Sequence, residues 1–214
     1  MKELEAKYGP QILAALGVTG IAAAIAQAKR HGTIDSTAIS GAVKGNVRYD
    51  TTAAAKQLQS MYQEAGQIGA ETAAGQIGAD TVLDNLPSVQ DLLDRASITV
   101  KNITDTQMSQ ISTTIENGIR SGLGSGDITE QITGIIGDPA RAQLIAVTET
   151  NRAYNAATTD TFIANGITRF NWVAYDGACP ECEELQAGSP YDVGDEVPPD
   201  HPNCRCWQSP TSGE

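Results

Sequence analysis

The sequence predicts an α+β protein, with a mostly helical N-terminal region and a small β-containing C-terminal domain closed by a Cys/His knuckle. Only 5% of the 214 residues are aromatic, and Ala, Gly, Thr and Ile are abundant, which is typical of helices packed through small side chains. The alternating pattern of a strand begins only after residue 166. All four cysteines and one of the two histidines lie between residues 179 and 206.

The first part of the chain is expected to be helical with glycine-rich breaks. Residues 11–30 predict one helix, and residues 31–50 predict a turn-rich segment because three glycines interrupt them. Within residues 51–80, AGQIGAETA is followed by AGQIGADTV, an internal repeat. Nine residues make about two and a half helical turns, so the two copies cannot share one face. Their small residues favour close contact between helices.

The apolar run at residues 12–26, ILAALGVTGIAAAIA, allows three interpretations. The preceding MKELEAKYGP offsets two Lys with two Glu, so it lacks the positive segment that opens an export signal. The run is also shorter than the roughly 20 residues needed to span a bilayer. We therefore expect a helix packed on a core or partner, with no membrane contact. An export signal and a membrane segment are the alternatives.

Capping and periodicity signals predict the next helices. Ser88 is expected to open a short helix at residues 88–96, and an apolar stripe predicts a second helix over residues 97–121. Asp127, with Glu130 three positions later, has the spacing of an N-cap and capping box. The stripe consists of Met108, Ile111, Ile115 and Ile119.

Asp138 and Pro139 are expected to start a long helix that ends at Gly166, because Asp is favoured at the N-cap and Pro at the first helical position. The expected apolar face comprises Ala140, Leu144 and Val147, and a polar stripe comprises Glu149, Arg152 and Asn155. Glu149 and Arg152 have the spacing of an ion pair on one helix.

The C-terminal segment changes character. Residues 167–176, ITRFNWVAYD, alternate between two faces and predict a strand. Residues 176–200 contain eight Asp and Glu and no Lys or Arg. Such a segment cannot bury a large core, so another interaction must hold it together.

The cysteines have the spacing of two metal-binding knuckles. Cys179 and Cys182 form a CxxC pair, and His201, Cys204 and Cys206 follow in HPNCRC. Structural zinc takes four nitrogen or sulfur ligands, and paired knuckles at this spacing supply them. We expect zinc to bind four of these five residues in a structural site.

Other states of the cysteines remain open at this point. Two disulfides, for example Cys179 with Cys206 and Cys182 with Cys204, would close the same loop. Four free thiols, or a catalytic cysteine beside His201, are further alternatives, but one nucleophile does not explain four clustered cysteines. A deaminase-type catalytic zinc would need a His-x-Glu upstream of the cysteine pair, and the chain has none.

Charge and motif content restrict the function. The net charge is -12 and the 14 Lys and Arg are scattered, so duplex DNA would repel the chain. We expect no direct sequence-specific contact with nucleic acid. The sequence shows no nucleotide-binding loop and no Ser-His-Asp set, so an enzyme is not expected.

The order of the C-terminal motifs resembles a known family. GLGSGDITEQI, ARAQLIAVTETNRAYNAA, FNWVAYDGACPECEEL and PPDHPNCRC follow one another over about residues 100–208. This resembles the C-terminal domain of the phage head morphogenesis family, the minor head proteins typified by the phage Mu F protein. The motif residues fall on Thr148, Glu149, Arg152, Ala153, Asn155, Trp172 and residues 201–206. Residues before about 97 show no such resemblance.

The resemblance implies a structural minor head protein of a tailed phage or prophage. It implies a docking region at residues 1–96 and a head morphogenesis domain at residues 97–214. The expected partners are the portal protein, the major capsid protein or both, in head assembly, DNA packaging or ejection. The expected location is the interior of the virion head, after synthesis in the host cytoplasm. DNA contact, associated with some members, conflicts with the negative charge.

Two other functions are kept as alternatives. One is a zinc-dependent hydrolase or effector carried in the head, with Glu149, Arg152 and Asn155 facing the cysteines. The other is an adaptor that forms homo-oligomeric rings through its N-terminal helices.

Overall fold

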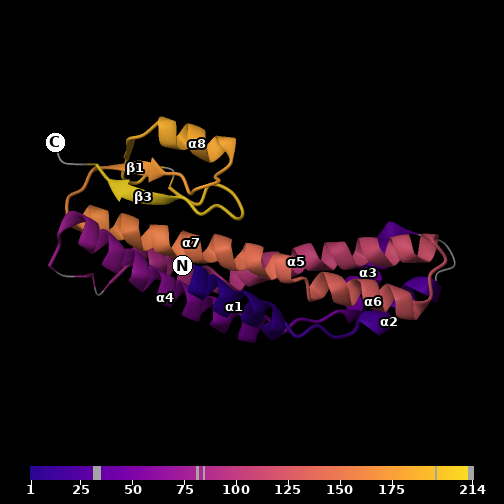
Figure 1. Cartoon of the computed structure of the whole chain (residues 1–214). Helices are drawn as coiled ribbons and strands as arrows, with labels where there is room; N and C mark the ends of the chain where they lie inside the picture. Colours follow the sequence, from indigo (N-terminus) through magenta and orange to yellow (C-terminus); the bar gives the residue numbers. More distant parts are fainter. Residues whose placement is uncertain (31–34, 81, 84, 196, 212–214) are drawn as a thin grey trace. The chain divides into compact units, whose positions relative to one another are not determined.

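The computed structural model describes residues 1–30, 35–80, 82–83, 85–195 and 197–211. These residues form an α+β fold, as the sequence predicts (Figure 1). In chain order the elements are α1 (Lys2–Ala15), α2 (Ile21–Arg30), α3 (Ser36–Asn46), α4 (Thr51–Ile77), α5 (Pro87–Arg120), α6 (Ser125–Ile136), α7 (Pro139–Ala164), β1 (Arg169–Val173), α8 (Pro180–Ala187), β2 (Tyr191–Asp192) and β3 (Trp207–Pro210).

The chain divides into two compact units, each assembled from separate segments. Unit 1 comprises Met1–Pro10, Gln57–Ala96 and Gln143–Glu214, and unit 2 comprises Gln11–Lys56 and Ser97–Ala142. Helices α1, α4, α5 and α7 each contribute residues to both units. No single cut in the sequence therefore separates the units. The division of function expected at residue 96 stays a prediction.

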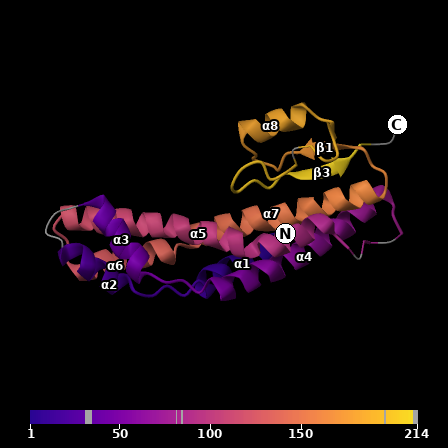
Figure 2. The same cartoon turned by 180° about the vertical axis from the view of Figure 1, so that it is seen from behind.

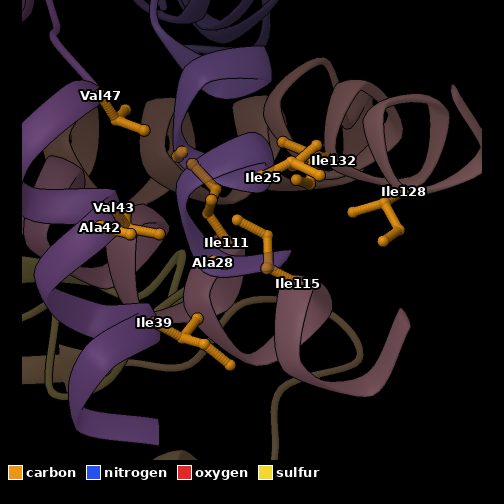
Figure 3. Close-up of a cluster of buried hydrophobic side chains, with 11 residues drawn as sticks. Ile25, Ala28, Ile39, Ala42, Val43, Val47, Ile111, Ile115, Ile128 and Ile132 are labelled. Atoms are coloured by element: carbon orange, nitrogen blue, oxygen red, sulfur yellow. The ribbon is translucent and has the colours of Figure 1, made fainter. Parts of the chain in front are cut away.

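Unit 2 is built around a cluster of buried aliphatic side chains from α2, α3, α5 and α6 (Figure 3). Ile111 and Ile115 are fully buried there, and Met108 and Ile119 pack at its edge. The predicted stripe on α5 is thereby confirmed. Gly118 lets α6 approach α5 closely, because a Cβ at this position would lie 2.5 Å from Cγ1 of Ile128.

The single helix expected over residues 11–30 is wrong. Helix α1 ends at Ala15, and α2 begins at Ile21. Between them Gly17 and Gly20 have φ of 41° and 84°, a region that favours glycine. A Cβ on Gly20 would lie 1.9 Å from the carbonyl oxygen of Asn46. The close approach of a second segment, which periodicity does not reveal, interrupts the helix.

The apolar run at residues 12–26 is packed against the protein along one side, whereas Ala22, Ala23 and Ala26 are exposed. Ile12, Leu16 and Ile25 are buried. Among the residues described, no helix has both the length and the hydropathy required to cross a membrane.

The turn-rich segment expected over residues 31–50 is wrong for residues 36–46, which form α3. Asp35 caps this helix, and its side chain accepts a hydrogen bond from the backbone N–H of Thr37. Gly41 and Gly45 are tolerated because Ile39, Ala42 and Val43 bury one face in the core of unit 2. Residues 31–34, which include Gly32, lie outside the described part of the chain.

Helix α5 is continuous, in place of the two helices expected at residues 88–96 and 97–121. Its start is capped by another helix. Asp160 of α7 accepts hydrogen bonds from the backbone N–H of Ser88 at 2.9 Å and from its hydroxyl at 2.6 Å. The expected N-cap at Asp127 is also wrong. Gly124 is the N-cap of α6, and the Asp127 carboxylate accepts from its N–H at 3.1 Å.

The two copies of the glycine repeat have different roles in α4. In the first copy, a Cβ on Gly69 would lie 2.3 Å from the carbonyl oxygen of Tyr154, so α4 and α7 touch through their backbones. Gly66 is similarly close to Val89. In the second copy, a Cβ on Gly75 would meet no described atom within 4 Å, and Gly78 follows the end of the helix with φ of 69°. Only the first copy makes the close contact expected.

The apolar face expected on α7 is only partly correct. Val147 is buried, but Ala140 is exposed and Leu144 is 43% exposed. The buried side of α7 includes polar residues, among them Asn151 and Asn155. In the first turns of α7 the predicted apolar face is therefore the exposed side of the helix. The start after Asp138 is confirmed, since its side chain accepts a hydrogen bond from the N–H of Ala140.

The three strands form an antiparallel sheet in the order β2-β1-β3. Trp172 pairs with Gln208, and Phe170 pairs with Tyr191 on one side and Pro210 on the other. Phe170 and Trp172 are buried, which confirms the predicted alternation, although the strand is shorter than residues 167–176. The sheet lies between α7 and α8 (Figures 1 and 2).

Candidate metal centre

All five candidate ligands come together between α8 and the segment that leads into β3. Cys179 is the N-cap of α8, and Pro180 at the first helical position fixes the backbone there. Cys182 follows in the first turn. His201, Cys204 and Cys206 face them from the loop before β3. Cys182, Cys204 and Cys206 are buried beside Trp172 in the core of unit 1.

The ligand atoms form two overlapping groups. Nε2 of His201 lies 3.2 Å from Sγ of both Cys179 and Cys182. Sγ of Cys182 lies 3.7 Å from Sγ of Cys204, and these atoms and Sγ of Cys206 are all within 4.8 Å of one another. Two thiolates on one tetrahedral zinc would be about 3.8 Å apart at ordinary bond lengths. The sulfur spacing therefore fits a metal ion.

All four cysteines are free in this structure, so the disulfide alternative does not describe it. Burial raises the pKa of the Cys182 and Cys204 thiols, because dry surroundings disfavour the thiolate. A hydrogen bond from the backbone N–H of Cys182 instead lowers the pKa of Cys179. A cation in the site would supply the charge that buried thiolates require.

His201 is oriented to act as a ligand through Nε2. Its Nδ1 lies 2.9 Å from the carbonyl oxygen of Pro202. An N–H donated to this carbonyl leaves the lone pair on Nε2, the atom that faces the sulfurs. The same contact is the main cause of the raised pKa of His201.

Side chains of helix α7 bind the backbone of the second knuckle, residues 201–206. The side-chain amide of Asn151 donates to the carbonyl oxygens of Cys204 at 3.1 Å and Cys206 at 2.9 Å. The amide of Asn155 also donates to Cys206, at 3.2 Å. One turn earlier, the hydroxyl of Thr148 accepts from the N–H of Asn203 at 2.9 Å.

The residues of α7 that bind the second knuckle coincide only in part with the polar stripe predicted from the sequence. Asn155 was placed in the stripe, but Asn151 was missed. The available signal was the spacing of Thr148, Asn151 and Asn155, which puts three short hydrogen-bonding side chains on neighbouring turns of one helix.

Glu149 and Arg152 form the ion pair expected from their spacing. Nη1 of Arg152 lies 2.5 Å and 2.7 Å from the two carboxylate oxygens of Glu149. The buried Tyr62 hydroxyl of α4 donates to the same carboxylate at 2.5 Å. These contacts tie α7 to α4 and occupy the Glu149 carboxylate.

The fold and the site together define a helical protein with a small antiparallel sheet, in which a long helix supports a Cys/His cluster. Residues 109–209 match the model of the family described as Phage Mu protein F like protein. This confirms the resemblance to the phage head morphogenesis family over that segment. The matched residues contain all five candidate ligands and the three side chains of α7 that hold the second knuckle. No curated protein and no solved structure gives a match to this chain.

Proposed function

We propose that this chain is a structural minor head protein of a tailed phage or prophage. The match of residues 109–209 to the phage Mu F family carries the proposal. In this role the protein works beside the portal protein, the major capsid protein or both, in head assembly, DNA packaging or ejection. It resides inside the virion head after synthesis in the host cytoplasm, and contact with partners or with further copies of itself runs through residues 1–96.

In this proposal zinc closes the cysteine cluster as a structural ion. Four of Cys179, Cys182, His201, Cys204 and Cys206 hold it. Cys182 belongs to both groups of neighbouring ligand atoms, which supports a place for it in the ligand set. The ion would fasten residues 176–200, which have few apolar side chains, to the sheet. A structural site needs no open coordination position.

A non-enzymatic role is supported by the contacts of the polar residues on α7. Asn151 and Asn155 bind backbone carbonyls, and Glu149 is paired with Arg152 and Tyr62. The net charge of -12 supports contact with protein over direct contact with DNA.

Quantitative mass spectrometry of purified particles tests the proposal. Procapsids and virions of the source phage or induced prophage would be compared, with the portal and major capsid proteins as internal standards of copy number. We expect a low, fixed ratio of this chain to the portal protein. Its absence from both particles would overturn the proposal.

A further inference from the structure

A pocket in unit 1 shares Arg205 and Tyr175 with the lining of the cysteine cluster but contains none of the five candidate ligands. Its volume is about 470 Å³, within the usual range of ligand sites. Residues from α1, α4, α7 and the segment around β3 line it. The side chains that matter are Lys2, Tyr154, Tyr175, Arg205 and Trp207.

The pocket concentrates the few aromatic residues of the chain. The sequence has six Tyr, two Phe and two Trp, and three of these ten line this one pocket. Tyr154, Tyr175 and Trp207 are all half-buried, and each contributes to the lining of the pocket. Trp172, in contrast, is buried in the core. Trp, Tyr and Arg are the residue types that dominate hot spots in protein interfaces.

The charges of the pocket are opposite to those of the chain as a whole. Nη1 of Arg205 lies 2.6 Å and 2.7 Å from the carboxylate oxygens of buried Glu5. Gln143 donates to the same carboxylate at 3.3 Å, so Glu5 is already satisfied. Lys2 is exposed, and its Nζ lies 6.0 Å from the Tyr175 ring centroid. The Arg205 guanidinium lies 5.9 Å from the same centroid.

Arg205 and Glu5 neutralise each other, and exposed Lys2 near the same ring leaves the lining side chains with a net positive charge. In a chain of net charge -12 this is a local positive site. It complements a group that combines an apolar side chain with a negative charge.

We propose that this pocket binds a segment of a partner protein that presents a large apolar side chain next to an acidic residue. The apolar group packs on Tyr154, Tyr175 and Trp207, and the carboxylate lies near Lys2. That the partner is a head protein rests on the proposed function, whereas the chemistry of the pocket does not.

The test is a titration of the full chain, labelled with ¹⁵N and observed at the indole N–H signals of its two Trp residues. The probe is the capped tetrapeptide acetyl-Ala-Phe-Glu-Ala-amide, with Lys in place of Glu and Ala in place of Phe as comparison peptides. We expect the first peptide to shift the Trp207 signal and leave Trp172 unchanged, with millimolar affinity. The Lys peptide should bind about two- to fivefold more weakly, as for an exposed ion pair.

Lys2→Glu should remove or reverse the preference for the Glu peptide. Lys44→Glu, the same charge change at an exposed position of unit 2, should preserve it. Equal shifts by the Glu and Lys peptides, or no Trp207 shift with any peptide, would overturn the inference. Neither result bears on the copy number of the chain in particles, so the proposed function stands or fails separately.

Discussion

Asn151 is the side chain of α7 that binds the backbone of two candidate ligands at once. It is buried, and it donates to the carbonyl oxygens of both Cys204 and Cys206. In Asn151→Ala both oxygens lose this donor inside the protein. We expect a loss of about 1–3 kcal/mol in the free energy of unfolding, measured by urea denaturation.

The matched control is Asn102→Ala, at an exposed position of α5. It should change stability by less than about 0.5 kcal/mol. If the two variants were equally stable, Asn151 would have no special part in holding the second knuckle.

Tyr49 presents the opposite situation, a polar group that costs stability. Its hydroxyl is buried without a hydrogen-bond partner among the described residues. Burial raises the pKa of Tyr49 to about 12 from an ordinary value of 10.0. Tyr49→Phe removes this hydroxyl, so we expect equal or greater stability at pH 7 in urea denaturation.

The same pKa gives a prediction for alkaline pH. Because the pKa is higher in the folded state, titration of Tyr49 leaves stability unchanged below about pH 10 and lowers it as pH rises toward about 12. The wild-type protein should therefore lose stability faster than Tyr49→Phe over this window. Parallel denaturation curves for the two proteins would contradict the assignment.

At the scale of elements, the repeated glycines of α4 supply a test within one helix. Gly69 faces the backbone of Tyr154, which cannot move without shifting α7. Gly69→Ala should lower the free energy of unfolding by about 1–3 kcal/mol through overpacking.

The matched control, Gly75→Ala, adds the same methyl group where no described atom is within 4 Å. It should stabilise the helix by about 0.5–1 kcal/mol. Thermal unfolding of both variants measures the difference, and changes of the same sign would contradict the packing described.

At the scale of the whole molecule, the cysteine cluster should control the C-terminal segment. We expect one zinc per chain in the purified protein, measured by elemental analysis, and loss of that zinc in Cys182→Ser. Protease cleavage within residues 176–208 should then accelerate, because little apolar surface holds this segment. Cleavage within α3 should be unchanged, since it belongs to unit 2. Equal cleavage of residues 176–208 in both proteins would remove the structural role of the cluster.

The sequence by itself determined the features that local chemistry controls. Asp138 and Pro139 start α7 because capping acts over a few residues. The spacing of apolar residues in the sequence predicts the buried stripe on α5 and the burial of Phe170 and Trp172 in β1. The five candidate ligands could be selected from the sequence because clustered Cys and His at knuckle spacing are typical of metal sites, and the structure brings them together. The C-terminal motifs also indicated the family whose model residues 109–209 match.

Only the tertiary structure decided the features that depend on distant segments. Gly20 breaks the expected helix because Asn46 approaches it, and α5 begins where Asp160 of α7 caps it. The polar residues Asn151 and Glu149 are buried because their partners come from the HPNCRC loop and from α4. Such contacts join residues up to 200 positions apart, as between Arg205 and Glu5. Local sequence propensity cannot predict these contacts, because a hydrogen bond or a close backbone contact between distant segments forms only when both have folded.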